Sequence, residues 1–150
     1  MKSLVLSFSE KKALVAQKLK EILCKKGYVV YTTDNLQGNL AKDEAYLTKL
    51  FHSDAFLIIN SPDYTLSENY FITFLESRCS SQRDTQVIVL SEEYPSTPII
   101  NRKNETLILN EHNINSCLNT IIQTINASKY KYKEIITKIL VCYPNLSIEL

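Results

Sequence analysis

The chain of 150 residues contains only two glycines, Gly27 and Gly38. Rossmann dinucleotide-binding folds, P-loop NTPases and protein kinases all rely on glycine-rich loops, because a backbone without side chains can approach a phosphate closely. Two separate glycines cannot form any of these loops. The sequence therefore gives no support to these three nucleotide-binding classes.

Closely spaced cysteines and histidines are also missing. The four cysteines are scattered and include no Cys-x-x-Cys pair; they are Cys24, Cys79, Cys117 and Cys142. The two histidines, His52 and His112, have no partners at metal-ligand spacing. Structural zinc sites and redox-active dithiols depend on such spacing. We therefore expect neither a metal site nor a bound cofactor.

Long apolar runs and a strong net charge are absent as well. No run approaches the roughly 20 apolar residues that span a bilayer, and the opening Met1–Lys12 is too short in apolar residues for a signal peptide. Seventeen basic and sixteen acidic residues leave a formal charge of +1, without the positive excess of a phosphate-backbone binder. We expect a cytoplasmic protein with neither a membrane nor a nucleic acid as partner.

Two kinds of apolar segment alternate along the chain. Short β-branched and aromatic runs predict strands, and they are Ser3–Phe8, Tyr28–Thr32, Asp54–Asn60, Thr85–Leu90 and Thr106–Asn110. Apolar residues at helical spacing predict helices, namely one between Ser9 and Gly27, then Asp43–His52, a helix capped by Ser67 and running through Arg78, Asn113–Ile125, and Tyr130–Cys142.

This alternation predicts an α/β fold: a flavodoxin-like three-layer sandwich with a central parallel sheet of four to five strands, plus an extra C-terminal helix. The expected strand order is 2-1-3-4-5, because crossovers are right-handed. Ligands of such sheets bind beyond the carboxyl ends of the strands, where the winding reverses. The segments expected to meet there are Ser7–Ser9, Asp34–Gly38 and Asn60–Tyr64.

Together these segments resemble a TIR (Toll/interleukin-1 receptor) domain of bacterial type. The resemblance rests on "LVLSFSEKKALVAQKLKEILCKKGYVVY", on the Asp-containing loop "TTDNLQGN", and on "YLTKLFHSDAFLIINSPDYTLSENY" with its Ser-Pro-x-Tyr-x-x-Ser pattern. It implies a TIR-like domain over residues 1–126 and a helical extension over 127–150, packed on the same domain.

Enzymatic TIR domains cleave NAD+ at the nicotinamide–ribose bond, sometimes cyclising the product, in antiviral and immune-type signalling. Their essential glutamate lies in a Ser-x-Trp-Cys-x-x-Glu pattern. Aligned on Ser67, this chain has Thr73 at the glutamate position, and Trp and Cys are replaced by Asn69 and Tyr70. Glu76, one turn beyond Thr73, is the candidate replacement. Glu68 would face elsewhere on a continuous helix, where it would favour the helix dipole.

The candidate site therefore combines a catalytic Glu76 with ligand-binding residues at the strand ends. The ligand-binding candidates are Ser7, Phe8, Ser9, Asp34, Asn60, Ser61 and Thr73. Each has a structural alternative. Ser7 and Ser9 can cap the first helix, Asp34 can start a turn, and Glu76 can pair with Arg78 or Arg83. Tyr64 is expected to pack over the sheet edge.

Three functions remain open at this point. The first is cleavage or cyclisation of NAD+, which is then a substrate and not a cofactor. The second is a catalytically silent TIR-like module that assembles with itself or with another TIR-type partner. The third is an enzyme like the nucleoside deoxyribosyltransferases, which share the sheet and a helix-borne glutamate, although their Gly-rich first loop is missing here.

Overall fold

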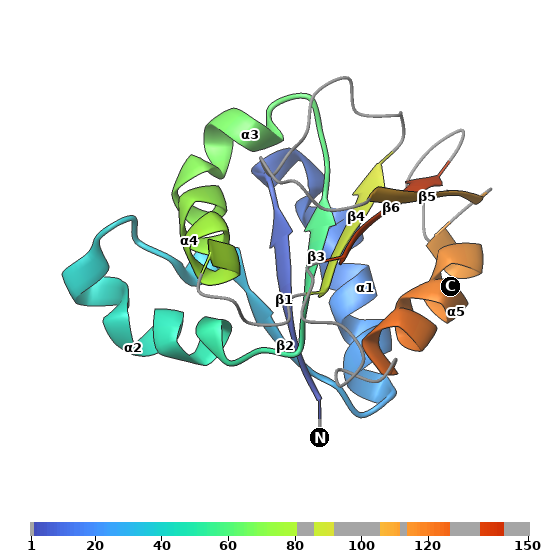
Figure 1. Ribbon diagram of the computed structural model, residues 1–150, viewed down its shortest axis with the longest axis horizontal. Helices are drawn as coiled ribbons and strands as arrows, with labels where there is room; N and C mark the ends of the chain where they lie inside the picture. The colour runs from blue at the N-terminus through green and yellow to red at the C-terminus, as the bar shows by residue number, and fades with distance from the viewer. Residues whose placement is uncertain (1, 81–85, 92–105, 112–113, 127–135, 143–150) are drawn as a thin grey trace.

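A computed structural model describes residues 2–80, 86–91, 106–111, 114–126 and 136–142 of the chain. This part contains six strands and five α-helices (Figure 1). The strands are β1 (Ser3–Phe8), β2 (Val29–Thr32), β3 (Ala55–Ile59), β4 (Gln86–Ser91), β5 (Thr106–Glu111) and β6 (Ile136–Cys142). The helices are α1 (Ala13–Lys25), α2 (Leu40–Phe51), α3 (Tyr64–Ser67), α4 (Asn69–Ser80) and α5 (Ile114–Asn126), with short 3-10 turns η1 (Glu10–Lys12) and η2 (Thr33–Asn35).

The strands form one sheet in the order β2-β1-β3-β4-β6-β5, and every neighbouring pair is parallel. The predicted flavodoxin-like α/β fold is confirmed, and so is the reversal of winding between β1 and β3. The predicted order 2-1-3-4-5 is wrong at its end, because β6 lies between β4 and β5.

The predicted C-terminal helix is also wrong, because residues 136–142 form strand β6. Residues 130–135 of that prediction lie outside the described part. The segment "ITKILVC" has apolar residues at helical spacing, but it is also rich in β-branched residues. A central strand buried on both faces cannot be told from a helix by periodicity alone. Residues 136–142 are therefore part of the sheet and not a helical extension beyond residue 126.

The sheet is covered on both faces, which explains why its strands are apolar throughout. Alternate residues of a strand point to opposite faces, so Leu4 and Leu6 of β1 pack toward α1 and α5, whereas Val5 packs toward α2 and α4. Figure 1 shows these two helical layers on either side of the sheet. In the second layer, the ring centroids of Phe56 and Phe71 lie 6.2 Å apart.

The connection after β3 differs from the predicted single helix that begins at Ser67. A short helix, α3, comes first, and Glu68 interrupts the path with φ −111° and ψ 24° before α4 begins. The side chain of Ser67 donates back to the Tyr64 carbonyl oxygen at 3.4 Å, so it does not cap α4 as predicted. Glu68 therefore lies between two helices and not within one.

Candidate functional site

Buried hydroxyl groups gather at the carboxyl end of β1. Ser7 is fully buried, and its Oγ lies 2.7 Å from the hydroxyl oxygen of Tyr64. Thr33, which follows β2, donates its hydroxyl to the same Ser7 oxygen at 3.1 Å. One hydrogen-bonded cluster thus joins the ends of β1 and β2 to the start of α3. Tyr64 was expected to pack over the sheet edge, but it is fully buried in the core on the α4 side of the sheet, and burial raises the pKa of its hydroxyl far above the ordinary value.

A second cluster joins the residues that follow β1 and β3. The hydroxyl oxygens of Ser9 and Ser61 lie 2.8 Å apart, and both groups donate to Oδ1 of Asp63, at 3.2 and 2.7 Å. These bonds, the one from Ser61 first, hold the pKa of Asp63 below its ordinary value, and the nearby Lys11 acts in the same direction. Asp63 therefore stays ionised. Helix capping does not explain Ser9, whose side chain makes no cap hydrogen bond to η1.

The other ligand-binding residues predicted near these strand ends belong to neither hydroxyl cluster. Asn60 is partly buried and donates its side-chain amide to Ser91 Oγ of β4 at 3.2 Å. Phe8 is 8% exposed and belongs to the core beside α1. Asp34 is exposed on η2, at the end of β2. The structure therefore brings Ser7, Ser9 and Ser61 into one buried region, with Asp34 and Asn60 at its borders.

Glu68, which the sequence analysis assigned to the helix dipole, is a further candidate for this site. Its side chain is half-buried at the break between α3 and α4. Burial raises its pKa to about 7, and the negative charges of Asp34 and Asp63 add to the increase. These two carboxylates follow β2 and β3, so acidic residues from two separate strand ends lie close enough to Glu68 to act on its pKa. A group with such a pKa exchanges protons readily at neutral pH.

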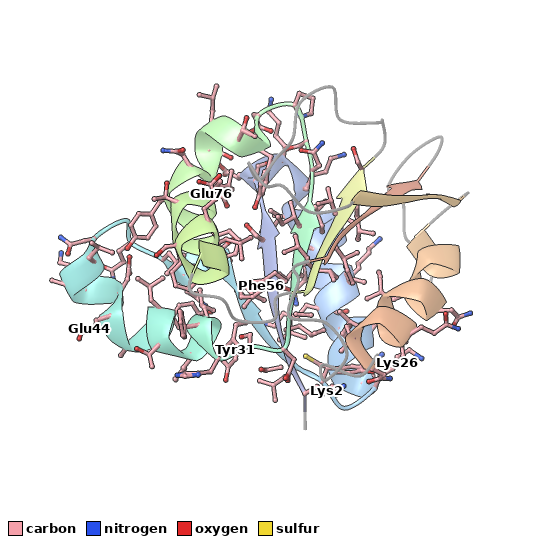
Figure 2. The ribbon with its side chains drawn as sticks, in the orientation of Figure 1. Lys2, Lys26, Tyr31, Glu44, Phe56 and Glu76 are labelled. Atoms are coloured by element: carbon pink, nitrogen blue, oxygen red, sulfur yellow. The ribbon has the colours of Figure 1, made fainter. Side chains whose placement is uncertain are left out.

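The two residues predicted on the following helix lie farther along α4. Thr73 is exposed, and its hydroxyl donates to the Asn69 carbonyl oxygen at 2.9 Å. Glu76 is partly buried and has an interaction partner within the chain; Figure 2 shows it on α4. At 1.5 Å per residue it lies about 12 Å along the helix from Glu68. Helix α4 runs from the carboxyl end of β3 back toward the start of β4. Glu76 therefore lies farther from the carboxyl ends of the strands than Glu68 does. The catalytic role of Glu76 stays a prediction.

A signal for Glu68 was nevertheless present in the sequence. Ser61-Pro62-Asp63 is a turn sequence directly after a buried strand, so the residues that follow it lie near the carboxyl ends of the strands, where ligands of such sheets bind. The sequence analysis assumed that Glu68 and Thr73 share one continuous helix, and on such a helix Glu68 would face away from the site. Because the helix is interrupted before α4, that argument no longer applies.

A shallow apolar groove lies apart from the strand ends, between α2 and α4. Its volume is about 520 Å³, and its apolar lining includes Leu40, Leu47, Phe51 and Phe74. Leu40 is 71% exposed. Within the described ranges, no helix is long and apolar enough to cross a membrane. The same part of the chain contains no group of three or more His, Cys, Asp or Glu residues arranged to hold a metal ion.

Comparisons of the chain with protein-family models, with curated proteins and with solved structures gave no match. The function must therefore be argued from the strand-end residues themselves.

Proposed function

We propose that the carboxyl ends of the strands bind a nucleotide and that Glu68 helps to cleave its N-glycosidic bond, with NAD+ as the substrate that the TIR resemblance implies. The observation that supports this most directly is the half-buried Glu68, whose charge is disfavoured by Asp34 and Asp63 and which directly follows the short helix that begins at Tyr64 of the buried hydroxyl cluster. In the proposed reaction, a nicotinamide leaving group departs as a neutral base and needs no proton from the protein.

The chemistry assigned to Glu68 has two parts. As the C1′–nitrogen bond breaks, its electron pair goes to nicotinamide and the ribose carries positive charge, which a nearby carboxylate stabilises. Water then attacks C1′ and gives a proton to the same carboxylate, yielding ADP-ribose. A base with a pKa near 7 is well suited to this transfer at neutral pH.

The acidic neighbours of Glu68 favour a cationic ligand portion. Asp34 and Asp63 add negative charge on the side where the positively charged nicotinamide ring would lie in this arrangement. The exposed Lys11, close enough to affect the pKa of Asp63, is the candidate contact for the pyrophosphate. Ser9 and Ser61 keep Asp63 ionised and oriented, so that it can accept a ribose hydroxyl.

The experiment compares Glu68 at the strand ends with Glu76 farther along α4. Purified wild type, Glu68→Gln and Glu76→Gln are incubated with NAD+, and free nicotinamide is measured by liquid chromatography; circular dichroism checks that each variant folds. We expect Glu68→Gln to lower the rate on the order of 10²- to 10³-fold, and Glu76→Gln to remain close to wild type. Loss of activity in Glu76→Gln alone would instead support the sequence-based assignment. No nicotinamide release by wild type would contradict the proposal.

The groove between α2 and α4 supports a second candidate, a TIR-like module that binds another copy of the chain. An exposed leucine beside an apolar groove is a feature of protein–protein contacts. Light scattering over a range of concentrations tests it with Leu40→Glu as the disrupting variant. Assembly of wild type that Leu40→Glu prevents, without nicotinamide release, would favour this role over catalysis. A wild type that stays monomeric at high concentration would exclude it.

A further inference from the structure

A buried carboxylate on α2 holds the last residues of the loop between β2 and α2, a loop that includes η2 and Asp34. Asp43 is only 2% exposed, and its Oδ1 accepts the Gln37 N–H at 2.9 Å. Its Oδ2 accepts the N–H groups of Gly38 and Asn39, at 3.0 and 3.1 Å. A buried carboxylate is costly unless it is hydrogen-bonded, and here three backbone donors satisfy it. The donor of Gln37 contributes most to lowering the pKa of Asp43, so the group stays ionised.

The other end of the same loop is also fixed from α2. The hydroxyl of Tyr46 donates to the Thr32 carbonyl oxygen at 2.7 Å and accepts the Thr32 N–H at 3.1 Å. It also accepts the side-chain amide of Asn35 at 3.4 Å. Asp34 lies between these two attachment points. Its position therefore depends on α2 and not only on the strand that precedes it.

Asp43 also lies beside the helix that begins after Glu68. The hydroxyl of Tyr70, on the first turn of α4, is buried and has no hydrogen-bond partner within the described part of the chain. Burial, together with the adjacent Asp43 carboxylate, raises the pKa of Tyr70. The same carboxylate thus contacts the loop that carries Asp34 and approaches the helix that starts next to Glu68.

We propose that Asp43 is a positioning residue, which holds the loop between β2 and α2 so that Asp34 faces Glu68. This inference deepens the proposed function and rests on it for its catalytic meaning. The charged groups that act on Glu68 are Asp34 from η2 and Asp63 from the turn before α3; Lys11 of η1 acts on Asp63. Only Asp34 among these belongs to the loop that Asp43 holds.

If this loop is loosened, the pKa of Glu68 should fall. Like charges disfavour the ionised form of a carboxyl group, so Asp34 helps to keep the proton of Glu68 in place. Asp43→Asn replaces one acceptor oxygen by an amide group that faces backbone donors and cannot accept from them. Asp34 then spends less time near Glu68, and Glu68 should release its proton at lower pH.

Carbon-13 NMR titration of the Glu68 side chain measures this effect without any substrate. We expect the titration midpoint to fall by about one pH unit in Asp34→Asn and to fall measurably in Asp43→Asn. If Asp43 acts through Asp34, the double variant should titrate like Asp34→Asn alone, because the second substitution then has nothing left to displace. Additive decreases in the double variant, or an unchanged midpoint in Asp43→Asn, would overturn the inference.

Two further variants make the test independent of folding defects. Tyr70→Phe removes the hydroxyl beside Asp43 but keeps all three loop hydrogen bonds, and its Glu68 midpoint should match that of wild type. If Asp43→Asn does not fold, Tyr46→Phe weakens the other attachment of the loop and should lower the same midpoint, and an unchanged value would overturn the inference. Because no activity is measured, this result is separate from that of the nicotinamide assay.

Discussion

Replacing Glu68 with glutamine should change the pH dependence of stability in a defined direction. The pKa of Glu68 is raised from 4.5 to about 7 in the folded protein. Between these values the folded state binds a proton that the unfolded state has already released. Wild-type stability therefore decreases as pH rises through this window and levels off above it. Glutamine does not titrate, so the variant lacks this decrease.

The expected size follows from the same shift. One pKa unit corresponds to about 1.4 kcal/mol, so the full shift sets an upper limit of about 3.4 kcal/mol on the free energy of unfolding lost at high pH. Glu68 is only half-buried, and solvent screens the charges of Asp34 and Asp63. We therefore expect about 1 kcal/mol. Relative to wild type, Glu68→Gln should gain this amount between pH 4.5 and pH 8.

Urea unfolding followed by circular dichroism, at both pH values and constant ionic strength, measures the difference. Glu44→Gln is the matched control, because Glu44 lies on the exposed side of α2, as Figure 2 shows. Glu44→Gln should change the free energy of unfolding by no more than about 0.5 kcal/mol, and by the same amount at both pH values. If Glu68→Gln lost stability at high pH instead, Glu68 would have a favourable cationic partner. The reasoning from burial and acidic neighbours would then be refuted.

Three other predictions concern the site and the core. The value of kcat/KM for nicotinamide release should rise with pH to a plateau above about 7, since the proposed reaction needs ionised Glu68. A value of kcat/KM that falls over this range would exclude that role. Tyr64→Phe removes the hydroxyl that contacts Ser7 and should lower the free energy of unfolding by about 1 kcal/mol in a urea titration; an unchanged value would mean that this hydrogen bond makes no net contribution. Phe71→Ala should lower the free energy of unfolding by about 3–5 kcal/mol in the same measurement, because it leaves a cavity against Phe56. A decrease below about 1 kcal/mol would mean that the core collapses to fill the cavity.

Much of the fold could be predicted because strands and helices here have strong local signals. The runs that became β1 and β3 are short, β-branched or aromatic, and bounded by turn residues, as expected for strands covered on both faces. The segment of β6 was ambiguous for a physical reason. Its position between β4 and β5 depends on pairing with distant strands, and sequence periodicity contains no information about such pairing.

The site was predictable to the level of segments but not of side chains. Parallel strands end at one edge, so Ser7, Ser9 and Ser61 could be expected to meet there. Their hydrogen bonds run to Asp63 and Tyr64, which neither composition nor spacing indicated. Glu68 was assigned away from the site because the sequence analysis placed it on one continuous helix with Thr73, whereas the structure interrupts that helix at Glu68. Element boundaries are where sequence reasoning is least reliable.

The arrangement of charges favours a ligand role for Glu68 over a purely structural one. A structural carboxylate is usually stabilised by donors that keep its pKa low, as the three backbone N–H groups do for Asp43. Glu68 is in the opposite situation, since burial and two neighbouring carboxylates destabilise its charge. Such a destabilised group costs folding free energy, and a cationic ligand would reduce that cost on binding. This contrast between Asp43 and Glu68 is what we expect if Asp43 builds the proposed site and Glu68 acts in it.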